Sequence, residues 1–231
     1  MTESATPSAW IAAGVQHAVL SRTMPALRHE LAGSVSVLRM GLAVVKRKLE
    51  LTTDPMVDCD AMSQRVESLE SGITDLSQSL RRLRHWDKPA DEMLSLRALV
   101  SEVWELARPF LALRNIEPAE LPDEHAAWSD EPVRPQPLMY MLLACIYHLA
   151  EGSGHTPRRL MLTVKGARLQ VSGDTGDTSE GLAAASTEPA RAISSTLQTP
   201  PIDRFALQCL AESLHGRIEF SADQTVSLQA G

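Results

Sequence analysis

Apolar residues in the first third of the chain recur at intervals of three and four positions, the spacing that places them on one face of a coiled-coil helix. One series runs through Met24, Leu27, Leu31, Val35, Leu38, Leu42, Val45 and Leu49. A second runs through Met62, Val66, Leu69, Ile73, Leu76, Leu80 and Leu83. Between them, "TTDPMVDCDA" (52–61) carries the Asp and Pro residues typical of a turn and a helix N-cap. The pattern predicts two helices folded into an antiparallel hairpin.

The predicted hairpin has more apolar surface than two helices can bury against each other. Two hairpins that pair into a four-helix bundle would cover both series. We therefore predict a homodimer formed through residues 20–87.

Beyond "WDKPADEM" (86–93) the heptad spacing stops, and two further helices are expected. Residues 94–115 keep apolar positions at helical spacing. Residues 135–152 are apolar on nearly all sides, as in a helix buried within a core.

Strands are expected after the second of these helices. "RLMLTV" and "ARLQVS" alternate apolar and polar residues around Lys165-Gly166, which is typical of a β-hairpin. A polar stretch from Asp174 to Thr199 indicates a loop, residues 203–216 a helix ending at a Gly cap, and "GRIEFSADQTVSLQA" a closing hairpin. Helices on one face of a mostly antiparallel sheet make this part an α+β sandwich.

These patterns predict four parts. Residues 1–19 form an N-terminal extension, residues 20–87 the helical hairpin, residues 88–93 a linker, and residues 94–231 the α+β sandwich. A length of 231 residues, 44% of them hydrophobic, is sufficient for two modest domains.

Composition narrows the possible partners and compartment. No apolar run reaches the roughly 20 residues of a membrane span, and "MTESATPSAW" lacks the basic and apolar regions of a leader, so we expect a soluble, cytoplasmic protein. A net charge of −7 argues against a nucleic-acid partner. The three cysteines, Cys59, Cys145 and Cys209, are widely spaced and odd in number, which predicts reduced thiols and no metal site.

One histidine stands out within "ALRHELAGSVSVLRMGL" (26–42). If Met24, Leu27 and Leu31 occupy positions a, d and a of the heptad, His29 falls at position f, which points away from the bundle core. The ordinary interpretation of such a residue is a solvated polar side chain. The functional one is a nucleophile open to an incoming partner, because a neutral imidazole attacks phosphoryl groups well near neutral pH.

The order of these pieces resembles the bacterial sensor histidine kinases over most of the chain. "RHEL" early in a heptad helix, then "LSLRALVSEVWELARPFLALRNIEP", a buried helix, a hairpin and "SLHGRIEF" carry the resemblance. It implies a dimerisation and histidine-phosphotransfer domain followed by an ATP-binding lobe, with His29 as the phosphoacceptor and Glu30 as the residue that orients or assists it.

The resemblance departs from the family where nucleotide binds. His148 stands in place of the magnesium-ligating asparagine, and Ala144 in place of the first asparagine of that box. "GDTGDT" (173–178) keeps Asp174 and Gly176 of the adenine-reading motif but not its last glycine. "PPIDRF" (200–205) has no glycine for close approach to phosphates. We therefore expect a degenerate lobe that uses no cofactor, with Mg²⁺ supplied by a partner receiver domain.

Arginines are expected near His29. Folding the hairpin brings residues near 81 opposite residue 29, so Arg81, Arg82 and Arg84 join Arg28 there. Solvated helix-end arginines are the ordinary interpretation. A basic collar that attracts the acidic active site of a response-regulator receiver, or of a hybrid histidine kinase, is the functional one.

The sequence thus favours a dimeric histidine phosphotransferase that relays phosphate between receiver domains through His29 without ATP. Three alternatives stay open. The chain is otherwise a pseudokinase adaptor that binds a kinase or receiver without carrying phosphate, an active histidine kinase with a divergent ATP site, or a structural coiled-coil protein with a fused α+β domain.

Overall fold

The computed structural model describes residues 6–51, 59–87, 93–123, 127–152, 156–174, 199–221 and 224–229. Its contacts divide the chain into two compact units. The hairpin unit is Met24–Ala90, and the sandwich unit combines Met1–Thr23 with Asp91–Gly231. Each unit is described by itself.

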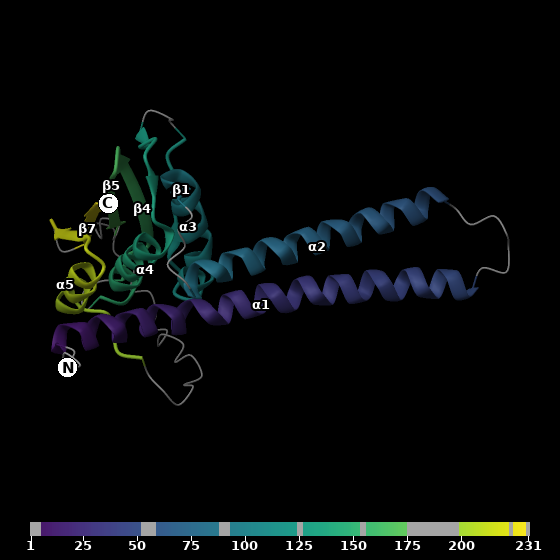
Figure 1. Cartoon of the computed structure of the whole chain (residues 1–231), viewed down its shortest axis with the longest axis horizontal. Coiled ribbons are helices and arrows are strands. Elements are labelled where there is room, and N and C mark those ends of the chain that lie inside the picture. The colour runs from purple at the N-terminus through teal and green to yellow at the C-terminus, as the bar shows by residue number, and fades with distance from the viewer. Residues whose placement is uncertain are drawn as a thin grey trace, which may run out of the picture. The chain divides into compact units, whose positions relative to one another are not determined.

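The hairpin unit consists of α2 (Cys59–Asp87) and of the part of α1 (Pro7–Leu51) that begins at Met24 (Figure 1). The predicted connection at 52–61 falls largely outside the described residues, since α2 begins at Cys59. Large and small residues alternate across the two helices. A Cβ added at Gly72 would lie 2.9 Å from Leu38 Cδ2, and one added at Gly41 would lie 2.8 Å from Leu69 Cδ2. Each leucine therefore packs against a glycine of the other helix.

The heptad series is divided in the structure between two faces. Leu27, Leu31, Leu38, Leu69, Leu76 and Leu83 are buried or half-buried. Val35, Leu42, Val66, Ile73 and Leu80 are instead exposed, with between 42% and 61% of each residue open to solvent. A single hairpin thus buries only part of each apolar series. Small residues such as Gly41, Gly72 and Ser79 occupy part of the interface between α1 and α2. The exposed residues of the two series form a second apolar stripe, which the interface does not cover.

A five-stranded mixed sheet, in the order β2-β4-β5-β7-β6, forms one layer of the sandwich unit. Its strands are β2 (Glu117–Pro118), β4 (Arg159–Lys165), β5 (Arg168–Asp174), β6 (Arg217–Phe220) and β7 (Thr225–Gln229). The β2–β4 pair is parallel and the other three pairs are antiparallel. Gly166 turns the β4–β5 hairpin with a φ of +60°, a conformation that glycine adopts without strain. A separate two-stranded sheet pairs β1 (Leu94–Ser95) with β3 (Pro132–Val133).

Three helices, α3 (Leu96–Ala112), α4 (Pro135–Glu151) and α5 (Arg204–Ser213), form the second layer. The central helix α4 packs on β5 and β7 and is flanked by α3 and α5. Strand residues that face these helices, among them Leu160, Leu169 and Val171, are completely buried, while their neighbours along each strand are exposed or half-buried. The predicted helices, both hairpins and the α+β sandwich are therefore present in the fold.

The end of α5 differs from the expected glycine cap. His215, rather than Gly216, has the positive φ of 56° that ends the helix. Gly216 is required for a different reason, because a Cβ there would collide with Met141 Sδ on α4. The expected loop at 174–199, apart from its two end residues, and most of the linker at 88–93 lie outside the described residues.

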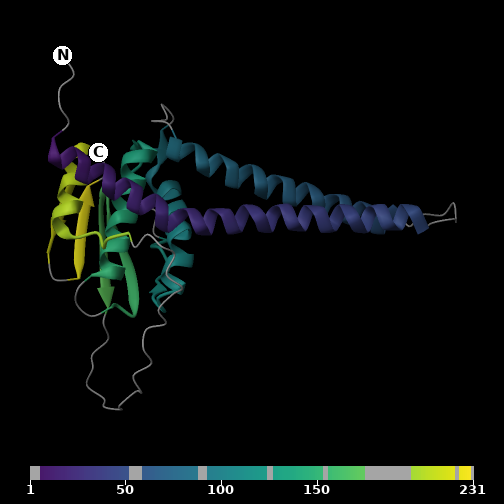
Figure 2. The same ribbon diagram turned by 90° about the horizontal axis from the view of Figure 1, so that it is seen from below.

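The first turns of α1 belong to the sandwich unit. Residues 7–19, expected as a separate extension, are helical and continuous with the rest of α1. They run beside α4 and α5 (Figures 1 and 2). Ala12, Val15, Ala18 and Val19 are buried there, which places them in the core of this unit. Their spacing of three and four residues was the available signal for this helix.

A hydrogen-bond chain fastens this segment to α4. The Thr23 hydroxyl donates to the Val19 carbonyl oxygen at 2.9 Å, so the Tyr147 hydroxyl donates to Thr23 Oγ1 at 2.8 Å. Burial raises the pKa of Tyr147 to about 12, although the bond to Thr23 and the nearby arginines act in the opposite direction. The phenol therefore stays protonated as a donor. Among the described helices, none combines the length and the hydropathy that a bilayer crossing requires.

Candidate functional site

His29 lies in the middle of α1 and its side chain is exposed, as is that of Arg28. The heptad argument predicted an outward orientation, and the exposure agrees with it. Pro25 lies inside the helix one turn before His29. It has no backbone N–H, so one hydrogen bond of the helix is missing there. The imidazole is therefore accessible on a helix that holds it in a defined place.

The residues that follow His29 on the same helix face are small. Ala32, Gly33 and Ser36, at three, four and seven positions beyond His29, are all exposed. Among the described residues beyond its chain neighbours and the local helix backbone, none has an atom within 4 Å of a Cβ built at Gly33. Along these positions of α1, the side chains that follow the imidazole are therefore short.

Glu30 faces the second helix of the hairpin. Its Oε1 accepts a hydrogen bond of 2.7 Å from the hydroxyl of Ser79, which is only 1% exposed. The same Ser79 hydroxyl lies 3.0 Å from the carbonyl oxygen of Asp75. The carboxylate expected to assist His29 is thus anchored on α2. Sequence reasoning missed Ser79, because the heptad series assigns Leu80, its neighbour, to the inward position between Leu76 and Leu83.

The helix pairing bears on the expected basic collar. The contacts of Gly41 with Leu69 and of Gly72 with Leu38 set an antiparallel register in which residue 81 lies opposite residue 29. The side chains of Arg81, Arg82 and Arg84 lie outside the described residues. The collar therefore stays a prediction.

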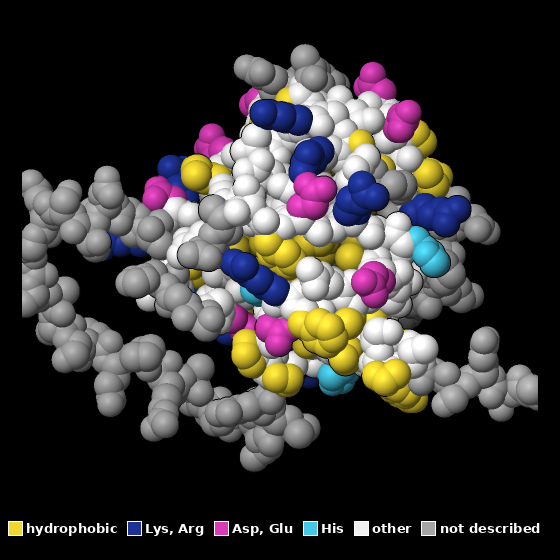
Figure 3. Space-filling model, turned by 90° about the vertical axis from the view of Figure 1, so that its left-hand side faces the viewer, with side chains coloured by type: hydrophobic (Ala, Val, Ile, Leu, Met, Phe, Trp, Pro, Cys, Tyr) yellow, Lys and Arg dark blue, Asp and Glu magenta, His cyan; other side chains and the backbone are white. Residues whose placement is uncertain are grey.

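A second candidate site is a cavity of about 400 Å³ in the sandwich unit, between the end of α4 and the start of α5. His148, Glu151 and Arg204 are among its lining residues. This is the place where the resemblance to kinases expects nucleotide. On the face of this unit nearest α5, apolar side chains gather in a hollow bordered by charged ones (Figure 3).

His148 has a structural partner at this cavity. Its Nδ1 lies 2.6 Å from the carbonyl oxygen of Ile202, which only accepts, so Nδ1 carries the proton. The ring also meets Phe220 edge-on at 5.9 Å between centroids. Ala144, one turn earlier, is completely buried and offers no donor or acceptor side chain. Neither residue supplies the oxygen ligand that magnesium prefers.

Glu151, at the end of α4, is held by two arginines. Arg22 Nη2 lies 2.6 Å from Oε2, and Arg114 Nη2 lies 2.8 Å from Oε1. Arg22 Nη2 also donates to the carbonyl oxygen of Pro200 at 3.0 Å, immediately before the cavity-lining residue Pro201. The carboxylate is consequently neutralised within the protein. The three residues are far apart in sequence, so no local pattern announced this ion triad.

The first backbone amides of α5 are capped by a side chain of this chain. Asp203 caps the helix, and its Oδ1 accepts from the Ala206 N–H at 2.7 Å. An anion-binding helix start leaves such amides open to a phosphate and brings the backbone close with glycines. Here a carboxylate takes the place of the anion, and the segment 200–205 contains no glycine. Among the described residues that line the cavity, none presents the open, glycine-flanked backbone amides that bind phosphates.

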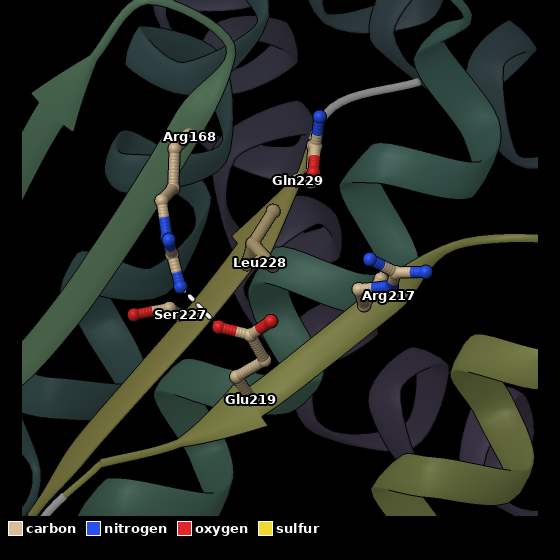
Figure 4. A pocket seen from close by; sticks show the side chains of 6 residues that line it. All are labelled: Arg168, Arg217, Glu219, Ser227, Leu228 and Gln229. Atoms are coloured by element: carbon tan, nitrogen blue, oxygen red, sulfur yellow. Dashed lines mark hydrogen bonds and ion pairs between the residues drawn. The ribbon is translucent and has the colours of Figure 1, made fainter.

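Figure 4 shows a smaller hollow on the face of the sheet that points away from the helices. Its volume is about 30 Å³, room for little more than a water molecule. An ion pair between Arg168 on β5 and Glu219 on β6 crosses it. The hollow is too small for a substrate. Within the described part of the chain, His, Cys, Asp and Glu side chains form no group of three or more that could hold a metal ion.

No protein-family model and no curated protein matches the chain. Several solved structures are similar in fold. A histidine kinase of Acinetobacter baumannii, AdeS, has 17% identity and a TM-score of 0.37 over 88% of this chain and 97% of that one. A bacterial phosphotransferase solved at 1.7 Å has 13% identity and a TM-score of 0.33 over 94% and 95%.

A histidine kinase from Burkholderia phymatum has 20% identity and a TM-score of 0.34, covering 88% of this chain and 96% of its own. At such identities and TM-scores, a similarity concerns the order of helices and strands and carries no function to the chain. The long helical hairpin followed by an α/β sandwich with a mixed sheet is the fold that the sequence predicted.

Proposed function

We propose that this protein is a dimeric histidine phosphotransferase, which takes phosphate from one response-regulator receiver domain and passes it to another through His29. The observation that carries the proposal is the exposed imidazole on a helix face whose following residues, Ala32, Gly33 and Ser36, leave room for a partner.

The transfer step needs few groups from this chain. An imidazole nitrogen of His29 attacks the phosphorus of the receiver's aspartyl phosphate, an N–P bond forms, and the acyl O–P bond breaks. The receiver's carboxylate leaves. The phosphorylated imidazole is first a cation, and it becomes neutral when the other ring nitrogen loses its proton. Glu30 stabilises the cation that develops on the ring, and the receiver brings Mg²⁺ for its own phosphate.

The cavity of the sandwich unit supports a relay without ATP. Glu151 is already neutralised by Arg22 and Arg114, Asp203 caps α5, and His148 is bonded to the Ile202 carbonyl oxygen. A chain that has both an accessible histidine in one unit and such a cavity in the other needs another phosphate donor. A phosphorylated receiver, or the receiver domain of a hybrid kinase, has the required acyl phosphate.

The exposed stripe of the hairpin unit supports the dimer. Val35 and Leu42 on α1 lie one heptad apart, and Val66, Ile73 and Leu80 on α2 repeat at the same interval. A surface apolar stripe with this period on both helices fits a second hairpin packed side by side.

The test is phosphate acceptance from radiolabelled, phosphorylated receivers of the same cell, read as acid-labile and base-stable label on this protein. His29→Gln is expected to abolish the label and to change the free energy of unfolding by less than about 0.5 kcal/mol, since an exposed side chain makes few core contacts. His17→Gln is the matched control, because His17 is an exposed histidine on the same helix. If His29→Gln accepts label as the wild type does, the adaptor function is the better account.

A further inference from the structure

Ser79 is a buried hydroxyl that reaches across the hairpin to the neighbour of the proposed phosphoacceptor. Its Oγ donates to Glu30 Oε1 at 2.7 Å, and the carbonyl oxygen of Asp75 lies 3.0 Å from the same Oγ. An ionised carboxylate only accepts hydrogen bonds, so the contact between Ser79 and Glu30 uses the single hydroxyl proton. A short bond to a charged acceptor is stronger than one to a carbonyl, which favours Glu30 as the main partner.

The bond settles where the Glu30 carboxylate lies. Consecutive residues of a helix point in different directions, so Glu30 and His29 do not face each other by helix geometry alone. His29 is exposed, while Glu30 is half-buried and anchored on α2. A glutamate on an open helix face would sample many rotamers, and each transfer would require it to be ordered again.

We propose that Ser79 is a positioning residue for phosphate transfer at His29, because it holds the carboxylate of Glu30, the next residue after His29, at one place between α1 and α2. The inference rests on the proposed function and names a residue of α2 on which that function depends. Glu30 has a further interaction besides the one with Ser79, so Ser79 sets the position of the carboxylate without being its sole contact.

Charged groups near this place come from both helices. Arg28 and Glu30 flank His29 on α1, and Asp75 lies on α2 one turn before Ser79. Asp75 is exposed, and the Ser79 contact is with its backbone carbonyl. Glu30 is therefore the carboxylate that the hydroxyl controls.

A double-mutant cycle in the full chain tests this role. Wild type, Ser79→Ala, Glu30→Ala and the double variant are labelled at His29 with phosphoramidate, a small donor that needs no docking surface. The imidazole nitrogen forms an N–P bond, the P–N bond of the donor breaks, and ammonia leaves. Ser79→Ala is expected to slow labelling roughly three- to tenfold, as for the loss of one hydrogen bond. The double variant is expected to be no slower than Glu30→Ala, because Ser79 acts through Glu30.

Ser77→Ala is the matched control. Ser77 also lies on α2 and donates to the carbonyl oxygen four residues earlier, that of Ile73, at 2.8 Å, but it is exposed. Its replacement is expected to leave the rate unchanged. A second readout is the carboxyl ¹³C signal of Glu30, which is expected to shift in Ser79→Ala and not in Ser77→Ala. If Ser79→Ala does not fold, Ser79→Cys, which keeps the size and weakens the donor, replaces it in the cycle.

The outcomes separate this inference from the proposed function. If wild type is labelled and Ser79→Ala is labelled equally fast, the positioning role is overturned while His29 remains the carrier. The same holds if Ser79→Ala slows labelling as much in the Glu30→Ala background as in the wild type, since Ser79 then acts by another route. If wild type takes no label from phosphoramidate or from any receiver, the proposed function fails and the positioning role fails with it.

Discussion

The Arg22 guanidinium donates hydrogen bonds to both oxygens of the Glu151 carboxylate: Nη2 lies 2.6 Å from Oε2, and Nε lies 3.2 Å from Oε1. The Arg22 side chain is 7% exposed and that of Glu151 15% exposed, so water screens the pair weakly. The pair fastens the first turns of α1 to the end of α4 within the sandwich unit.

Glu151→Gln is expected to destabilise the protein by about 2–3 kcal/mol, because Arg22 and Arg114 then face each other without the carboxylate between them. Arg22→Ala is expected to cost less, about 1–2 kcal/mol, since Arg114 still neutralises Glu151. Urea unfolding followed by circular dichroism measures both. The control is Arg108→Ala, which removes an exposed ion pair with Glu105 and is expected to cost under about 0.5 kcal/mol. Equal effects of Arg22→Ala and Arg108→Ala would contradict this account of the triad.

Leu42→Glu combined with Ile73→Glu is expected to convert the dimer to a monomer. Both residues are exposed on the stripe, so the charges are tolerated in a single hairpin but would be buried in a bundle, at a cost of several kcal/mol. Light scattering at micromolar concentration measures the mass, and circular dichroism checks that the helices persist. Met40→Glu is the control, because Met40 is more exposed on the same helix and lies off the stripe. A wild-type monomer at these concentrations would refute the dimer.

Stability is expected to fall as pH rises above about 9. Burial raises the pKa of the Cys145 thiol from 9.0 to about 12 and, as the largest effect, that of Tyr147 from 10.0 to about 12. Between these values the folded chain holds protons that the unfolded chain has released. The stabilisation is thus complete below pH 9 and is lost toward pH 12, by up to about 1.4 kcal/mol per pH unit for each group.

Urea unfolding at a series of pH values between about 8 and 11 measures this slope. Cys145→Ala is expected to remove the share that begins near pH 9, and Tyr147→Phe the share that begins near pH 10. An unfolding free energy that stays level over this range in the wild type would show that neither group is desolvated as the fold indicates.

Magnesium and ATP are expected to bind the protein with a dissociation constant above about 100 μM, equivalent to roughly −5.5 kcal/mol. The reasons are the Asp203 cap on α5, the hydrogen-bonded His148, and Glu151 already paired with arginines. Isothermal titration calorimetry measures the constant. Tighter binding would favour an active kinase with a divergent site over the phosphotransferase.

Local patterns predicted the elements of this fold well, because each helix and hairpin has its own periodicity and turn residues. The β4–β5 hairpin around Gly166 and the buried helix α4 are examples. What the patterns could not show is which neighbour covers each face. The heptad spacing of Leu42 and Leu38 is equivalent in the sequence, yet Leu38 packs against Gly72 and Leu42 is exposed.

The candidate site likewise has one feature that the sequence predicts and others that it does not. The exposure of His29 follows from its heptad position, which is a local property. The contact of Glu30 with Ser79 depends on the register between helices, and the triad of Arg22, Arg114 and Glu151 joins residues from α1, the turn after α3, and α4. Such contacts are set by tertiary packing, so a single sequence offers no spacing from which to infer them.

The two glycine–leucine contacts of the hairpin unit also fix how α1 and α2 are aligned along their length. Gly41 receives Leu69, and Gly72 receives Leu38, so the large and small partners exchange helices from one layer to the next. A slip of one helix by four residues would set Leu38 against Leu76, where two large side chains would clash, and a slip by three would set Gly41 against Gly72 and leave a void. Because only the native alignment fills every layer, the glycines determine which residue of α2 stands level with His29, although neither glycine lies near it in sequence.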